Sequence, residues 1–269
     1  MSDHDVTPVA QALAAIADAQ CRAAMRALGN VEDRHDGVHQ ARKAIRRLRA
    51  TLILCRKAFG DALLPVDRDL QRLASSLSSL RDAQAVIGTA EKLATDGHDE
   101  WLAVADALRR RRDTLLDDAL AKDPGFKRRC HQLRAARQAI SALPWSQLRA
   151  KTLRKAWEKT TSKVDELAEE HAARPTAASL HRWRRRVRRQ RLQLETLRKL
   201  HKKVGPHAAA HLPHKGKTLH ELTKLAEQLG FRQDLQVLRS ALVQVADPAR
   251  LPHLRGRIRD ELKPGSRGG

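Results

Sequence analysis

Aromatic residues and cysteines are scarce in this 269-residue sequence: Phe, Trp and Tyr together make up 3%, and Tyr is absent. Proteins that hold single-stranded nucleic acids usually offer aromatic side chains for base stacking, so the scarcity argues against that mode. Cys21, Cys55 and Cys130 are odd in number and lie far apart, which argues against a disulfide framework and predicts reduced, structural thiols. No run approaches 18 apolar residues, and no targeting segment is visible, so we expect a cytoplasmic protein without a membrane span.

Acidic residues are also few, with 31 Asp and Glu against 53 Lys and Arg, a net charge of +22 and a pI of about 11. Such an excess attracts an anionic partner, and the arginines that dominate the densest stretches match phosphate oxygens with paired donors. Phosphoryl transfer needs carboxylates to hold metal ions, and a phosphate loop of the GxxxxGK[ST] type is missing. The sequence therefore predicts phosphate-polyanion binding without catalysis, cofactor or metal.

Apolar residues recur at helical spacing along most of the chain, and no strand alternation is visible, which predicts an all-α fold. Gly and Pro positions and polar caps place the helix ends. The expected helices cover residues 6–28, 37–59, 67–80 (continued or followed by 81–95), 99–121, 126–143, 146–173 and 176–201, then shorter helices and a frayed tail at 263–269.

Two sequence blocks occur twice, in the same order. Residues 39–49 and 181–191, which are 142 positions apart, both begin with His and then carry bases three, four, seven, eight and ten positions later. At an offset of 152, a second block aligns Leu70, Leu73, Leu77, Asp82, Gln84 and Val86 with Leu222, Leu225, Leu229, Asp234, Gln236 and Leu238. The repetition predicts a duplicated chain, one domain of two pseudo-symmetric helical bundles formed by residues 6–143 and 146–262.

The first block of each copy predicts a basic helix. At 3.6 residues per turn, its His and bases fall on one broad stripe beside an apolar stripe. Solvated helix faces usually mix signs, so nearly acid-free runs indicate a missing counter-anion. The predicted binding residues, called the basic face below, are His39, Arg42, Lys43, Arg46, Arg47, Arg49, His181, Arg184, Arg185, Arg188, Arg189 and Arg191, with Arg72, Lys217 and Lys224 as secondary contacts. Asp82 and Asp234, in the second block, are expected to cap a helix or pair with an arginine.

These features together resemble the CHAD family, the conserved histidine α-helical domain. The resemblance is carried by the two His-x-x-Arg-x-x-x-Arg-Arg-x-Arg patterns, by 80–82 (Leu-Arg-Asp) and by 229–234 (Leu-Gly-x-x-x-Asp). It implies two bundles around a central basic groove or pore, non-catalytic binding of inorganic polyphosphate, location at polyphosphate granules, and association with a triphosphate tunnel enzyme or granule proteins. Ser78 stands where the family commonly has glycine, and Gln190 interrupts the second apolar stripe.

The same basic face could bind RNA or DNA. Charge alone does not separate these polymers from polyphosphate, because each presents repeated phosphates. A helix that reads a major groove usually places Asn or Gln among its bases, and Gln40 and Gln190 give this alternative little support.

Overall fold

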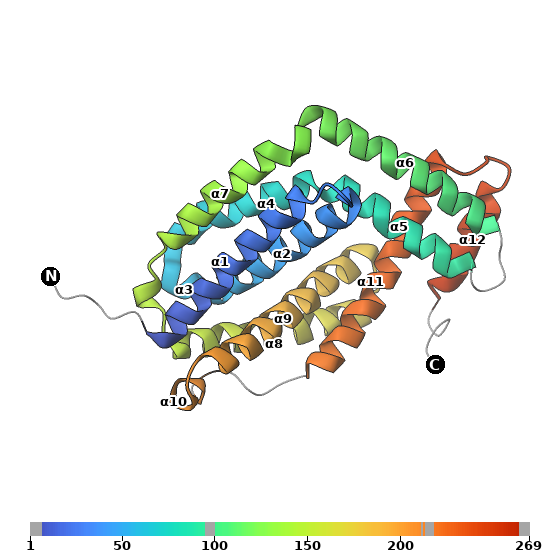
Figure 1. Cartoon of the computed structure of the whole chain (residues 1–269). Helices are drawn as coiled ribbons and strands as arrows, with labels where there is room; N and C mark the ends of the chain where they lie inside the picture. Colours follow the sequence, from blue (N-terminus) through green and yellow to red (C-terminus); the bar gives the residue numbers. More distant parts are fainter. Residues whose placement is uncertain (1–6, 95–99, 211, 213–217, 264–269) are drawn as a thin grey trace. The chain divides into compact units, whose positions relative to one another are not determined.

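The chain is helical wherever its structure is described. The computed structural model describes residues 7–94, 100–210, 212 and 218–263, which contain helices and turns and no strand, so the all-α prediction is confirmed. The α-helices (Figure 1) are α1 (Pro8–Gly29), α2 (Arg34–Leu54), α3 (Arg56–Phe59), α4 (Leu63–Ser76), α5 (Ser78–Ala94), α6 (Glu100–Lys122), α7 (Lys127–Ser141), α8 (Ala150–Ala173), α9 (Ala177–Lys203), α10 (Pro206–Ala209), α11 (Leu219–Ala241) and α12 (Leu251–Glu261). Short 3-10 helices lie at Gly60–Ala62, Pro124–Phe126, Trp145–Gln147 and Leu242–Gln244. None of the described helices is both long and apolar enough to cross a membrane.

The chain forms two compact units. Unit 1 comprises Met1–Leu77 and Gly125–Ala226, and unit 2 comprises Ser78–Pro124 and Glu227–Gly269. Each unit therefore takes residues from both predicted repeats, 6–143 and 146–262. Both copies of the second sequence block pass from unit 1 into unit 2, at the α4–α5 junction in one copy and within α11 in the other. The duplication and its pseudo-symmetry remain predictions.

Unit 1 is built on two helical hairpins, α1–α2 and α8–α9, whose members pack along each other (Figure 1). The helices α2 and α9 are also in contact, so the two hairpins share one packed body. Between α1 and α2 the approach is close at Gly37, where a Cβ atom would lie 2.4 Å from the carbonyl oxygen of Ala27. Only glycine fits that position without a shift of the backbone.

Unit 2 has its own hydrophobic core. The fully buried Trp101 of α6 packs in a cluster with Val86 and Ile87 of α5, and with residues of α11 and α12. Near this core Arg81 places Nη1 2.8 Å from Oδ1 of Asp82 and 3.8 Å from Oδ1 of Asp234. The prediction that these two aspartates pair with an arginine is confirmed.

Two predicted helices need correction at both ends, and the second of them, expected over 67–80, ends at Ser76. The helix expected over 37–59 begins at Arg34 and ends at Leu54, and a separate turn, α3, follows up to Gly60, whose φ of +54° ends it. The helix expected to start at Asp67 begins at Leu63, because Pro65 lies in the first turn, where its missing N–H has no helical partner to lose. The expected N-cap Asp99 lies outside the described residues, as does nearly all of the tail, 264–269.

Candidate polyanion-binding site

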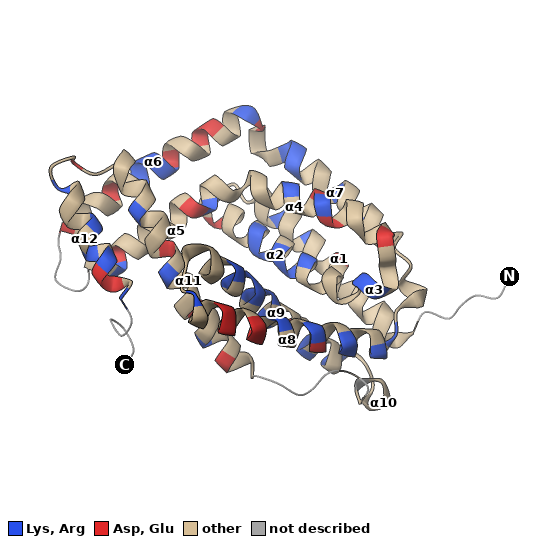
Figure 2. Cartoon of the chain, turned by 180° about the vertical axis from the view of Figure 1, so that it is seen from behind, with Lys and Arg blue, Asp and Glu red and all other residues tan. Residues whose placement is uncertain are grey.

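The two basic helices, α2 and α9, lie against each other in unit 1. Where they meet, the hydroxyl oxygens of Thr51 and Thr196 are 2.9 Å apart and fully buried. Close by, Nε2 of Gln193 donates to the carbonyl oxygen of Ala50 at 3.2 Å. In Figure 2 the ribbon is coloured blue, for Lys and Arg, at positions along both helices. The twelve residues of the basic face thus belong to one packed pair of helices in one unit.

Apolar side chains fix the orientation of each basic helix. The predicted stripe of α2 is buried throughout: Val38, Ala41, Ile45, Leu48 and Leu52. In α9, Leu180 and Val187 are buried in the same way. The polar interruption, Gln190, is also fully buried, and its Nε2 donates to Oγ1 of Thr161 on α8 at 3.0 Å. The glutamine therefore ties α9 to α8 by a hydrogen bond where the repeat would place a leucine.

Members of the basic face differ in their access to solvent. His39, His181 and Arg185 are exposed, whereas Lys43, Arg46, Arg47, Arg49, Arg188, Arg189 and Arg191 are partly buried. Arg184 is only 7% exposed, so its assignment to the accessible face needs correction. Arg42 is engaged elsewhere: its Nη1 donates to the carbonyl oxygen of Ala74, in the last turn of α4, where carbonyls lack partners within the helix. Stripe geometry reveals neither the burial of Arg184 nor the contact of Arg42 with α4.

Acids from within the chain neutralise part of the basic face. The carboxylate of Glu195 accepts from Arg191 and from Nε of Arg47, 3.2 Å from Oε2. Asp67 of α4 holds Arg49 in a two-pronged pair, with Nε–Oδ1 at 2.7 Å and Nη2–Oδ2 at 3.1 Å. The expectation that only an external anion balances these helices is therefore wrong for three arginines. Asp67 is far from the basic helix in sequence, so only the folded chain reveals this pairing.

Other members keep an unbalanced charge. No acid in the described ranges lies within ion-pairing distance of Lys43, Arg185 or Arg189. The pKa of Arg189 is lowered to about 10, first by burial and then by the positive charges of Arg186, Arg49 and Arg185, while Asp67 acts in the opposite direction. A bound anion would offset both causes, because it would provide hydrogen-bond acceptors and negative charge together.

Of the three predicted secondary contacts, the two that the structure describes show no link to the basic face. Arg72 is exposed on α4 and pairs with Asp69, three residues earlier on the same helix. Lys224 is exposed on α11, with no described interaction to α2 or α9. Lys217 lies outside the described residues. These positions remain predictions without a structural link to the main set.

Sequence reasoning missed a third basic element, on α8. Lys155, Lys159 and Lys163 line one pocket together with Arg186 and Arg189 of α9. The helix α8 also carries Glu158, Asp165, Glu166, Glu169 and Glu170, so its composition is typical of an ordinary solvated face. The spacing of four between successive lysines, which places them on one stripe, was the signal available in the sequence.

Comparison with known proteins identifies the family. A sequence profile described as the CHAD domain matches residues 10–243, a range that contains both basic helices. The chain belongs to the CHAD family. A crystal structure of the CHAD domain from the plant Ricinus communis aligns with a TM-score of 0.65 at 23% identity, over 97% of this chain and 88% of that one. This likeness supports a CHAD fold, and no match was found among curated proteins.

Proposed function

We propose that this CHAD protein binds inorganic polyphosphate through the basic face of α2 and α9 and catalyses no reaction. The observation that carries the proposal is the packing of the two basic helices against each other in one unit. Exposed His39, His181 and Arg185 and partly exposed Lys43 and Arg188 then offer charge from both helices to one polymer. Arginine and lysine would hold phosphate oxygens by charge and by forked hydrogen bonds, which require no particular base or sugar.

The family supports the same ligand. Binding of polyphosphate is what membership of the CHAD family implies, and the net charge of +22 fits a long anion. We further propose a cytoplasmic protein that attaches to polyphosphate granules and works beside a triphosphate tunnel enzyme or granule proteins. A central groove or pore between two bundles remains part of this proposal.

The decisive variant reverses charge on both helices at accessible positions. Lys43→Glu together with Arg185→Glu should weaken binding of long-chain polyphosphate by at least about a hundredfold, because attraction becomes repulsion at the site itself. The matched control is Lys202→Glu with Lys203→Glu, exposed residues at the end of α9 that change the net charge of the protein by the same amount. Circular dichroism checks that both variants remain helical. Equal losses in the two variants would reduce the effect to overall charge and refute the assigned face.

Salt and competition separate polyphosphate from its rival ligand. For a single-strand polyanion, the logarithm of the affinity should fall with the logarithm of salt concentration by roughly 0.7 per phosphate contacted, so several contacts give a steep line. Long polyphosphate and a mixed-sequence RNA of equal charge are then compared at one fixed salt concentration. A flat salt response, or preference for the RNA, would contradict the proposal.

A further inference from the structure

A separate pocket of about 830 Å³ lies on unit 1. Its lining residues come from α3, α8 and α9 and from the last turn of α2. Its volume is in the range of small-molecule sites, roughly 300–1,000 Å³. Seven bases and one acid line it. From α8 come Lys155, Lys159 and Lys163, on successive turns of one stripe about 12 Å long at 1.5 Å of rise per residue. The bases therefore surround a hollow from several helices and do not merely follow one helix.

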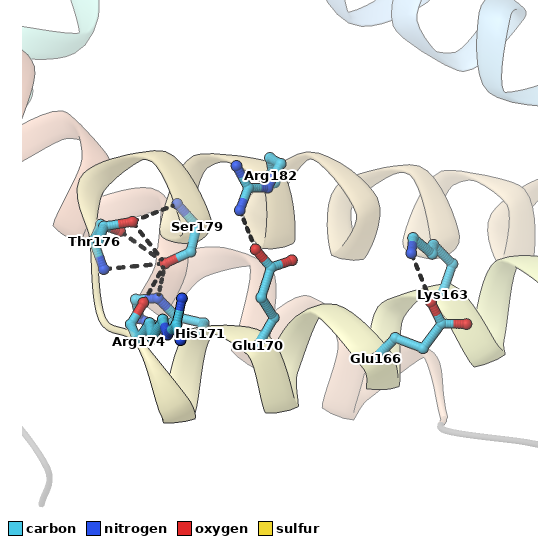
Figure 3. Close-up of polar contacts among 8 residues, drawn as sticks. All are labelled: Lys163, Glu166, Glu170, His171, Arg174, Thr176, Ser179 and Arg182. Carbon is cyan, nitrogen blue, oxygen red and sulfur yellow. Dashed lines mark hydrogen bonds and ion pairs between the residues drawn. The ribbon is translucent and has the colours of Figure 1, made fainter.

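The positive charge of this pocket is scarcely balanced from within the chain. The acid, Glu166, pairs with Lys163 of its own helix at 2.6 Å, as Figure 3 shows, and the pKa of this carboxyl is lowered chiefly by that hydrogen bond. In the described part of the chain, no acid lies within ion-pairing distance of Lys155, Lys159 or Arg186. Besides Arg186 and Arg189 of α9, five bases line the pocket from α3 and α8, and of these five Lys163 pairs with the lining carboxylate, Glu166.

The repeat shows how this pocket differs from its counterpart. At the offset of 142 that aligns the basic blocks, four lining positions of this large pocket correspond to lining positions of a second, small pocket of about 10 Å³. The corresponding pairs are Arg189 with Arg47, Lys57 with Lys199, Ser162 with Gln20, and Ile53 with Glu195. The first three pairs keep a base or a polar group. The fourth exchanges a carboxylate for an apolar side chain.

That single exchange changes the electrostatics of the two pockets. In the small pocket, Glu195 accepts from Arg47 and Arg191, so the chain supplies its own anion to the arginines. In the large pocket, Ile53 occupies the corresponding position, and no described carboxylate lies within ion-pairing distance of Arg189. Because Glu195 balances the arginines of the small pocket, we expect the bases of the large pocket to be balanced by an anion from outside the chain.

We propose that the large pocket is a binding site for a compact anion with several phosphates, such as an inositol polyphosphate or a short linear polyphosphate. Several phosphates are needed to balance six surplus positive charges, seven bases against one acid. Arg56, Arg186 and Arg189 favour phosphate because their planar donors grip two oxygens at once. The hydroxyl of Thr152 adds a neutral donor at the wall. This site borders the proposed polyphosphate surface and shares Arg189 with it, while its other lining bases lie outside the basic face.

The sharpest test installs the missing carboxylate without removing a base. Isothermal titration measures the affinity of the full chain for inositol hexakisphosphate, tripolyphosphate and sulfate at fixed ionic strength. Ile53→Glu should lower the affinity for both phosphate compounds by at least about tenfold, since the new carboxylate competes for the bases. Ile53→Gln has the same size without the charge and should stay within about threefold of the parent protein. Ile53 is partly exposed, so both side chains can reach solvent.

A second pair of variants keeps the proposal testable if position 53 does not tolerate a charge. Lys155→Gln with Lys159→Gln should reduce the affinity at least about tenfold, whereas Lys151→Gln, an exposed lysine of α8 outside the pocket, should not. Tighter binding of the inositol compound would assign a cyclic ligand, and tighter binding of tripolyphosphate a linear one. Compact phosphates that bind no better than sulfate, or pocket variants that bind like the parent, would overturn the site.

The two proposals fail in different measurements. Loss of long-chain binding in Lys43→Glu with Arg185→Glu, with compact-anion binding retained, supports both sites as separate. If the parent protein binds compact phosphates but no long polyphosphate, the proposed function is refuted and the pocket remains. If it binds only the long polymer, the pocket is refuted and the proposed function remains.

Discussion

Glu195→Gln removes one negative charge from the contact between α2 and α9 and should affect stability and binding in opposite directions. The glutamate, whose side chain is 17% exposed, accepts from both Arg47 and Arg191. A hydrogen bond to a charged group contributes about 1.5–3 kcal/mol net, and partial exposure of all three side chains reduces this by solvent screening. Glutamine keeps the shape and one acceptor oxygen. We therefore expect the free energy of unfolding to fall by about 1–2 kcal/mol.

The same change should strengthen anion binding. Glu195 competes with an external anion for two arginines of the basic face, so its neutralisation frees them for phosphate. If about 1.4 kcal/mol of that competition is relieved, the affinity for long polyphosphate rises roughly tenfold. Saturating polyphosphate should then restore the stability of the variant, because a ligand that binds only the folded state stabilises it by mass action.

Urea denaturation followed by circular dichroism, with and without polyphosphate, measures both effects in one design. Glu170→Gln is the matched control, because Glu170 pairs with Arg182 at an exposed site between α8 and α9 (Figure 3), where an ion pair contributes at most about 1 kcal/mol. The control should shift neither quantity appreciably. If Glu195→Gln unfolds at the urea concentration of the parent protein and binds with unchanged affinity, the reasoning about this carboxylate is refuted.

Two other predictions concern buried groups of unit 1. Thr51→Val and Thr196→Val should each lower the free energy of unfolding by about 1 kcal/mol. The double variant should lower it by less than the sum, because the two hydroxyls contact each other at 2.9 Å. Strict additivity in a double-mutant cycle would contradict that pairing. Burial raises the pKa of Cys21 to about 11 and that of Cys55 further. At pH 8 a thiol reagent should therefore modify the partly exposed Cys130 first. Equal labelling of all three cysteines in mass spectrometry would contradict this prediction.

Periodicity sufficed to predict the helical fold and the position of most helices. It predicted α6, α7, α8 and α9 to within a few residues, because Gly, Pro and polar caps mark where hydrogen bonding along the backbone changes. It extended α2 across Cys55, where the helix breaks before α3. Nothing in the local pattern announces that break, since the flanking residues are good helix formers.

The candidate site was predicted in outline and not in its charge balance. The stripe pattern identified the helices that carry the bases, since apolar and polar faces alternate with the helical period. It could not reveal that Asp67 of α4 reaches Arg49, or that Arg42 binds the end of α4, because both contacts join residues far apart in sequence. The lysine stripe of α8 was not predicted, because acidic residues on the same helix give it the composition of an ordinary solvated face. Only the folded structure shows that Glu166 pairs with Lys163.

The division of each unit between distant chain segments has a consequence for biosynthesis. In unit 2, Val86 and Trp101 are made early, yet the same core also requires Leu235, Leu254 and Ile258. A growing chain would expose those early apolar side chains until residues near 258 have left the ribosome. Nascent CHAD chains of this kind should therefore depend on protection by chaperones, and a translation pause between residues 124 and 227 should promote aggregation.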